Sequence, residues 1–206
     1  TGDAGDNRLV GQGGDDTLKG GAGNDTLDGD FIPFPVTGVG TGNGYATLGT
    51  GATNNSIAAA FDLTANFSLA ADADIVDATT LAHSTVTATG NGQGGYYKLT
   101  VNAGTVITLD LDHTAGGLDD SYIWLMRADG TVIAENDDAG NDPGSSVRTD
   151  SGLSFKVGET GTYYIVVGHY DNDTGEPEQT VPTGGSYELN VSVTPPPPVM
   201  PNIGAA

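Results

Sequence analysis

The stretch YYKLTVNAGTVITLDLD, residues 96–112, contains two runs in which apolar and polar residues alternate. This alternation predicts β-strands, because successive side chains of a strand point to opposite faces of its sheet. The apolar faces are formed by Tyr97, Leu99 and Val101 in the first run, and by Ile107, Leu109 and Leu111 in the second. Asp110 and Asp112 point away from the second apolar face, so the stretch predicts both a buried core and an acidic outer face.

Five further runs of this kind follow, with turn residues between them. They are YIWLMR (122–127), TVIA (131–134), LSFKV (153–157), TYYIVV (162–167) and SYELNVSV (186–193). Ala128, Asp129 and Gly130 join the first two, and an Asp-Gly pair between apolar runs predicts a β-hairpin. This number of short strands predicts an all-β fold, an antiparallel β-sandwich or jelly roll. One helical turn is predicted from Ile57 to Phe61.

The N-terminal segment contains three nonapeptides in register, residues 2–10, 11–19 and 20–28. The recurring apolar positions hold Leu9, Leu18 and Leu27, and the recurring oxygen-donor positions hold Asn7, Asp16 and Asp25. Glycines allow a tight turn with carbonyls pointing inward, and the carboxylate supplies a further oxygen for a cation. The apolar residue anchors a short strand of a parallel β-roll.

These repeats resemble the RTX repeat, G-G-x-G-x-D-x-U-x, in which U is a large apolar residue. The resemblance implies calcium bound between turns two repeats apart, so that residues 2–7 would pair with residues 20–25. Asn7 departs from the Asp of the pattern, and we expect weaker calcium binding at that turn. Three repeats make an incomplete roll, so we expect the chain to be part of a longer multidomain protein.

The chain is strongly acidic, with 6 Lys plus Arg against 27 Asp plus Glu and a net charge of −21. Nucleic acid and anionic membranes are therefore poor partners, because both require a cationic surface. The acids comprise 22 Asp and 5 Glu, and they accompany 33 Gly. Short acidic side chains in glycine-rich turns suit an oxygen-seeking cation, although Asp and Gly are also ordinary turn formers. The absence of cysteine excludes disulfides and thiolate metal sites.

The composition divides the chain into four segments. We predict RTX repeats over residues 1–30, a Gly- and Pro-rich connecting segment over 31–52, a calcium-binding β-sandwich over 53–194 and a Pro-rich linker over 195–206. No apolar run is long enough to span a membrane, so direct membrane insertion is not expected. A calcium-dependent module functions where calcium is plentiful, which predicts a secreted or cell-surface protein.

Residues 54–193 resemble the bacterial pre-peptidase C-terminal (PPC) family, in the form found inside large RTX surface proteins. Besides the opening stretch, the matching segments include SIAAAFDLTANFSLAADADI (56–75), DDSYIWLMRADGTVIAENDD (119–138) and GTYYIVVGHY (161–170). The resemblance implies a compact β-sandwich that often binds calcium and has a non-catalytic role in attachment or positioning. Related modules in RTX adhesins bind ligands, and some capture peptide termini with the help of calcium.

Acidic residues collect in the loops at the ends of the predicted strands. If these loops converge, calcium would turn the repulsion between their carboxylates into binding. The candidate calcium ligands of the sandwich are Asp110, Asp112, Asp119, Asp120, Asp137, Asp138, Asp142, Asp171 and Asp173. The preferred subset is Asp112, Asp119, Asp137, Asp138 and Asp142. The alternative is an acidic rim that is simply solvated.

No pattern in the sequence predicts catalysis. A pair of carboxylates could serve a glycosidase, but in a chain with so many acids such pairs arise by chance. The sequence contains no nucleophile elbow, HExxH zinc motif or phosphate-binding loop. His83, His113 and His169 are isolated, so we expect packed or surface histidines and a protein that is not an enzyme.

The acidic loops predict a calcium-dependent module, and the family resemblance implies a ligand-binding domain of a secreted or cell-surface RTX protein, with a role in cell adhesion and biofilm formation. An incompletely coordinated calcium ion accepts either a peptide carboxylate or the vicinal hydroxyls of a glycan. The family resemblance favours an extracellular peptide or protein terminus as the partner, and a glycan is the alternative. The candidate ligand-binding residues are Tyr170, Asp171, Asn172, Asp173 and Glu176. A calcium-stiffened spacer and an accessory domain of an exported enzyme are the alternatives.

Overall fold

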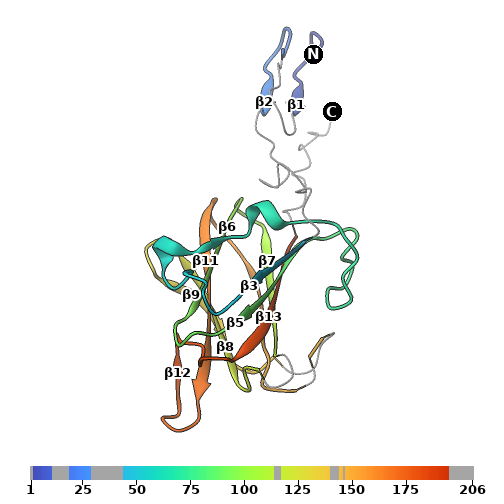
Figure 1. Cartoon of the computed structure of the whole chain (residues 1–206). Helices are drawn as coiled ribbons and strands as arrows, with labels where there is room; N and C mark the ends of the chain where they lie inside the picture. The colour runs from blue at the N-terminus through green and yellow to red at the C-terminus, as the bar shows by residue number, and fades with distance from the viewer. Residues whose placement is uncertain are drawn as a thin grey trace.

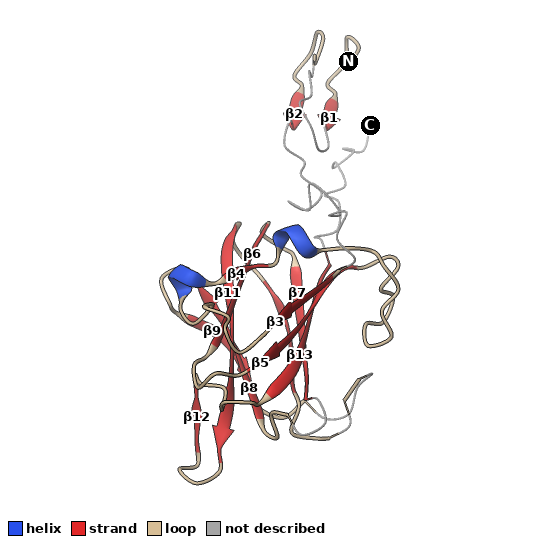
Figure 2. Ribbon diagram, in the orientation of Figure 1, coloured by secondary structure: helices blue, strands red, loops and turns tan. Residues whose placement is uncertain are grey.

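The computed structural model describes residues 2–10, 19–28, 44–113, 117–139, 144–145 and 147–194. These residues are almost entirely β-structure, and Figures 1 and 2 show two sheets that face each other in a sandwich. The predicted all-β fold class is confirmed. The predicted ligands Asp16 and Asp142, most of the connecting segment, and the linker over residues 195–206 lie outside the described residues.

Five strands form the first sheet, in the order β10-β7-β13-β5-β3. Their bounds are Ser151–Lys156 (β10), Val106–His113 (β7), Ser186–Thr194 (β13), Ala82–Thr89 (β5) and Tyr45–Leu48 (β3). Neighbouring strands are antiparallel, except that β3 pairs with β5 in parallel. Because β3 belongs to this sheet, the sandwich begins before residue 53, inside the segment predicted to be a connection. The glycines around this short strand hide its alternation in the sequence.

The second sheet has the order β4-β6-β11-β8-β9, and β12 pairs with β11 off this path. The bounds are Phe61–Asp62 (β4), Gly95–Val101 (β6), Gly161–Asp171 (β11), Ser121–Arg127 (β8), Val132–Asn136 (β9) and Glu176–Glu178 (β12). All pairs are antiparallel except β4 with β6. The long strand β11 therefore lies at the centre of the sheet and runs on into the turn before β12.

The core lies between the two sheets, where the predicted apolar faces meet. The six apolar residues of the stretch over residues 96–112 are all at most 2 % exposed. Burying one large aliphatic side chain contributes roughly 1.5–3 kcal/mol, so these faces supply much of the force that holds the sheets together. Two hydroxyls also lie in this core, and those of Tyr97 and Tyr187 are hydrogen-bonded to each other at 2.7 Å.

The predicted hairpin joins β8 to β9. The backbone N–H of Arg127 donates to the carbonyl of Thr131 at 2.9 Å, and the carboxylate of Asp129 accepts from the N–H of Thr131 at 2.9 Å. Gly130 has a φ of +85°, which a residue with a side chain adopts only at a cost. The Asp-Gly pair thus forms the turn for the reason that the sequence suggested.

The helices of the described residues are two 3₁₀ turns, Ile57–Ala59 (η1) and Thr64–Asn66 (η2). The first of them is the predicted helical turn. Neither is long enough to span a membrane, and no other helix occurs in this part of the chain.

The segment between η2 and β5 lies against the outer face of the first sheet. Ser68 forms an isolated bridge with His83 of β5. Further along, the carboxylate oxygen Oδ2 of Asp72 accepts hydrogen bonds from the Tyr45 hydroxyl at 2.8 Å and the Thr85 hydroxyl at 2.9 Å. These contacts hold residues 68–74 beside the strands that carry the outward-facing acids of the sheet.

Two turns of the nonapeptide repeats are described, and they lie side by side. Strands Arg8–Val10 (β1) and Thr26–Asp28 (β2) pair in parallel. The N–H of Asn7 donates to Oδ1 of Asp25 at 2.9 Å, and the N–H of Asn24 donates to Oδ1 of Asp6 at 2.7 Å. Turns two repeats apart therefore meet, as the resemblance implied.

Candidate functional site

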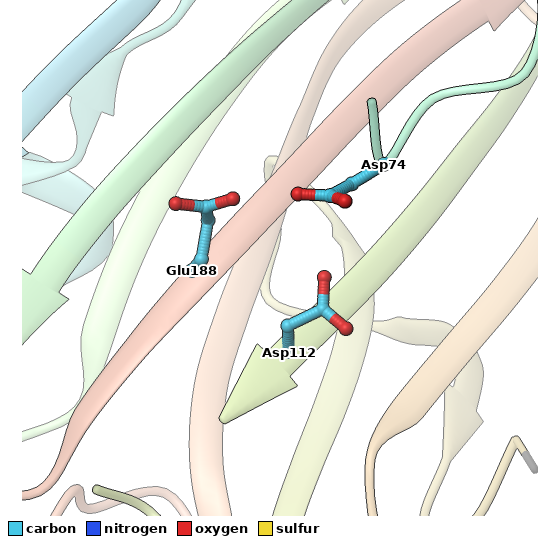
Figure 3. A group of neighbouring side chains, drawn as sticks. All are labelled: Asp74, Asp112 and Glu188. Carbon is cyan, nitrogen blue, oxygen red and sulfur yellow. The ribbon is translucent and has the colours of Figure 1, made fainter. Parts of the chain in front are cut away.

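Three carboxylates come together on the outer face of the first sheet, and we call them the Asp112 cluster. Asp112 comes from β7, Glu188 from β13, and Asp74 from the segment that lies against the sheet. Each offers an oxygen atom that lies within 4.8 Å of those of the other two. Figure 3 shows the three side chains gathered over the same part of the sheet.

The strand pairing explains this meeting. Asp112 and Glu188 are direct partners in the antiparallel register of β7 and β13. Both alternate with core residues, so both point outward. Asp112 is nevertheless only 6 % exposed, and its Oδ2 accepts a hydrogen bond from the side-chain amide of the neighbouring Asn190 at 3.1 Å.

Electrostatics in the Asp112 cluster favour neutralisation. The pKa of Glu188 is raised, first by burial and then by the negative charges of Asp74 and Asp72. No Lys or Arg forms a salt bridge with Asp74 or Glu188 within the described residues. A cation held between the three carboxylates would remove this repulsion.

A second group, the Asp137 cluster, contains Asp120, Asp137 and Asp138, whose ligand oxygens also lie within 4.8 Å of one another. Asp120 precedes β8, and the other two follow β9. The hairpin places the start of one strand beside the end of the other, with Ile123 opposite Asn136. The acids are therefore brought together by the hairpin that the sequence predicted.

Asp137 has a buried carboxylate oxygen that lacks a hydrogen-bond donor in the described part of the chain. Its Oδ1 is buried, and it has no hydrogen-bond partner among the described residues. The pKa of Asp137 is raised, first by burial and then by the charges of Asp138 and Asp120. A buried carboxylate oxygen without a donor is costly, and a metal ion is one group that would satisfy it.

A pocket of about 430 Å³ adjoins the Asp137 cluster, and we call it the Tyr170 pocket. Asp120 belongs to both the pocket wall and the cluster. The N–H of Tyr170 donates to the backbone carbonyl of Asp120 at 3.1 Å, and the side-chain amide of Asn172 donates to its Oδ2 at 2.8 Å. The turn after β11 is thereby fastened to a carboxylate of the cluster.

The five predicted ligand-binding residues divide into two groups. Tyr170 and Asn172 line the pocket, whereas Asp171, Asp173 and Glu176 do not. Asp171 has a structural contact instead, because its Oδ1 accepts from the N–H of Asp173 at 2.8 Å, and this hydrogen bond lowers its pKa. Asp173 and Glu176 are exposed on the turn.

The preferred calcium ligands do not meet at one point. Asp112 lies in one cluster and Asp137 with Asp138 in the other, while Asp119 lines the Tyr170 pocket. Asp110 lines a cavity of about 320 Å³ on the outer face of the first sheet, and Asp74 of the Asp112 cluster lines the same cavity. The expected single convergence of loops is therefore replaced by two clusters, because strands β7 and β8 belong to different sheets.

Asp74 and Glu188 are not among the ligands predicted from the sequence. Glu188 alternates with Tyr187 and Leu189, and this pattern alone places it on the same outer face as Asn190. Only the pairing of β13 with β7 places Glu188 opposite Asp112, and the sequence does not reveal that pairing. Asp74 carried no such signal, because it lies in a segment without regular structure.

The three histidines have structural contacts. His113 Nδ1 lies 3.2 Å from Oδ1 of Asp150. His83 Nδ1 lies 2.9 Å from the carbonyl of Leu81, and His169 Nδ1 lies 2.7 Å from the carbonyl of Thr180. Of the three, only His169 lines the Tyr170 pocket.

Two family models match the chain. The model described as the bacterial pre-peptidase C-terminal domain matches residues 93–169, and that of the RTX calcium-binding nonapeptide repeat matches residues 1–31. RTX repeats typically bind calcium, and the PPC domain is found in secreted proteins. These matches support a calcium-binding protein that is exported. No curated protein matches the chain.

Several solved structures are similar over about half of the chain. The periplasmic g-type lysozyme inhibitor PliG of Aeromonas hydrophila is 18% identical, with 55% of this chain and 86% of that chain covered and a TM-score of 0.34. The PPC domain of a Bacillus anthracis collagenase is 16% identical, with 54% and 89% covered and a TM-score of 0.35. CorA, a surface-associated copper-binding protein of Methylomicrobium album BG8, is 12% identical, with 55% and 93% covered and a TM-score of 0.32.

Residues 1–31 thus match the RTX calcium-binding nonapeptide repeat and residues 93–169 match the PPC domain, the two families that the sequence resembles.

Proposed function

We propose that this chain is a calcium-dependent ligand-binding module of an exported RTX protein, with a role in adhesion and without catalytic activity. One observation carries the proposal: Asp120 is shared between a cluster of three carboxylates and the wall of a pocket. An ion bound by the Asp137 cluster would therefore fix a side chain of the ligand site. Binding of the ion and binding of the ligand would be coupled through that residue.

Calcium suits the Asp137 cluster on chemical grounds. The ion takes about six to eight oxygen ligands at roughly 2.3–2.6 Å, and three carboxylates leave room for a ligand oxygen. Extracellular calcium modules have dissociation constants on the order of 0.1–1 mM, so the site would fill outside the cell and remain unloaded in the cytosol. Without the ion, the repulsion among Asp120, Asp137 and Asp138 would loosen the pocket wall.

The ligand that we favour is a peptide or protein terminus on a target surface. The test is binding of the purified chain to a combined peptide and glycan array, in calcium and again in chelator. Peptide spots that bind in calcium and are lost in chelator support the proposal. Calcium-dependent glycan spots would replace the peptide ligand by a glycan. A blank array from a folded, calcium-loaded chain contradicts ligand binding altogether.

The double variant Asp137→Ala, Asp138→Ala is tested on the same array beside the wild-type chain. It removes two carboxylates from the cluster but leaves every residue of the pocket wall in place. We expect it to lose the calcium-dependent spots. Retention of those spots would separate ligand binding from the Asp137 cluster.

A structural spacer is the second candidate, and the Asp112 cluster favours it. That cluster joins a segment without regular structure to strands β7 and β13, and it shares no residue with the Tyr170 pocket. An ion there would stiffen the sandwich by joining that segment to the two strands, although Asp74 also lines the cavity of about 320 Å³ on the outer face of the first sheet. The blank array described above is the result that this candidate predicts.

A further inference from the structure

We infer that the Tyr170 pocket accepts a positively charged group of its ligand, an ammonium or a guanidinium, with Asp119 as the ion-pairing residue. This inference rests on the proposed function, since it names the chemistry that the pocket would recognise on a peptide. A cationic group bound by Asp119 is distinct from a peptide carboxylate bound by calcium, because the two groups carry opposite charges.

The wall of the Tyr170 pocket is acidic. The acids of the wall are Asp119 and Asp120, and no Lys or Arg lines it among the described residues. A calcium ion in the Asp137 cluster would not reverse this balance, because the three carboxylates carry one more negative charge than the ion neutralises. The wall therefore stays acidic with or without calcium, and an acidic wall attracts a cationic ligand.

The two acids of the wall are not equivalent. Asp120 accepts the Asn172 amide at 2.8 Å and belongs to the Asp137 cluster. The exposed carboxylate of Asp119 has no partner among the described residues, although its backbone carbonyl accepts from the Thr149 hydroxyl at 2.6 Å. Its backbone is thus held while its charge remains available to a ligand.

The rest of the wall suits a cationic peptide. Tyr170 supplies an aromatic ring whose hydroxyl donates to the carbonyl of Gly175 at 2.9 Å, so the side chain is held in place. Ammonium and guanidinium groups are attracted to aromatic faces within about 6 Å. Gly117, Gly184 and Gly185 also line the pocket, and residues without side chains let a peptide backbone approach closely.

The test uses the full chain, isothermal titration calorimetry and about 2 mM calcium, which exceeds the dissociation constants typical of extracellular calcium modules. The probes are four hexapeptides with free C-termini that differ only in charge. Their N-terminus is either free or acetylated, and their second residue is either lysine or norleucine. This set separates an N-terminal ammonium from a side-chain ammonium as the source of the charge.

Charged peptides are expected to bind more tightly than the acetylated norleucine peptide, and to weaken as salt is raised. Asp119→Asn, which keeps the shape of the side chain, should weaken the charged peptides by about two- to fivefold and leave the neutral one unchanged. Glu159→Gln, at an exposed residue outside the pocket, is the control for loss of one negative charge.

Equal affinity for all four peptides, or charged peptides that bind Asp119→Asn as tightly as the wild type, would overturn this inference. Calcium-dependent peptide binding would then still support the proposed function. If no peptide binds in calcium, the proposed peptide-binding function fails together with the inference.

Discussion

Asp112 of β7 and Glu188 of β13 lie directly opposite each other in the antiparallel register of the first sheet. Their carboxylate oxygens approach within 4.8 Å, with Asp74 as the third member of the group. Two acids at paired positions repel, and such pairs destabilise a sheet by about 0.2–1 kcal/mol. The first sheet therefore contains a built-in repulsion that a cation would relieve.

Glu188→Gln is expected to stabilise the chain in chelator, because it removes one charge from this pair without changing the shape of the side chain. A gain of up to about 1 kcal/mol corresponds to a rise in Tm of roughly 2–4 °C for a domain of this size. Thermal unfolding in EDTA measures the shift, with Glu159→Gln as the control at an exposed acid outside both clusters. A lower Tm for Glu188→Gln in EDTA would show that the carboxylate stabilises the ion-free fold.

The double variant Asp137→Ala, Asp138→Ala is expected to lose much of the rise in Tm that calcium gives the wild-type chain. The reason is that a ligand stabilises a fold only through a site that exists in the folded state. Differential scanning fluorimetry with and without calcium gives the two shifts. The double variant leaves the described RTX turns unaltered, so calcium bound there is expected to give a residual rise in Tm. A calcium-induced rise in Tm equal to that of the wild type would contradict calcium binding by the Asp137 cluster.

Asn172→Ala is expected to loosen the turn after β11, because the Asn172 amide donates to the carboxylate of Asp120 at 2.8 Å. Hydrogen exchange of the backbone amide of Gly175, which donates to the carbonyl of Asp171 at 2.7 Å, reports on that turn. Faster exchange at Gly175, with unchanged exchange in β6, is the predicted pattern. If exchange at Gly175 equals that of the wild type, the turn holds its shape without Asp120.

The pair of tyrosines in the core predicts a loss of stability at alkaline pH. Burial raises the pKa of Tyr97 to about 12 from 10.0, and it raises the pKa of Tyr187 as well. A proton that binds more tightly in the folded state stabilises the fold below the unfolded pKa. That contribution is lost as the pH rises through the folded pKa, so stability should fall between about pH 10 and 12.

Tyr97→Phe should make this fall less steep, because one of the two buried phenols is removed. At neutral pH the variant should be less stable by about 1–3 kcal/mol, since the Tyr187 hydroxyl loses its partner. Urea unfolding at neutral and alkaline pH gives both quantities. Tyr163→Phe is the control, because its hydroxyl donates to the carbonyl of Glu159 and lies outside the pair. An equally steep fall in Tyr97→Phe would contradict the assignment.

Much of the fold could be predicted from alternation alone. The apolar faces of β6, β7 and β13 are buried as their patterns indicated, and the Asp129-Gly130 turn forms the predicted hairpin. Pairing between strands that are far apart in the sequence could not be predicted, because alternation gives the face of a residue but not its neighbour. For this reason Asp112 was assigned to the right face, while Glu188, its partner, was missed.

The candidate site was predicted in part for the same reason. Asp120, Asp137 and Asp138 were all among the candidate calcium ligands, and the predicted hairpin between β8 and β9 is the element that brings them together. The convergence of Asp120 with Tyr170 and Asn172 depends on the pairing of β8 with β11, which joins segments far apart in the sequence.

The central claim, that calcium is bound by the Asp137 cluster, is tested most directly by counting ions. Equilibrium dialysis against calcium, at about 1 mM free ion to match extracellular modules, gives the number bound per chain. The account predicts that Asp137→Asn, Asp138→Asn binds one ion fewer than the wild type while circular dichroism shows the same β-structure. An equal number of ions in the two proteins would contradict it.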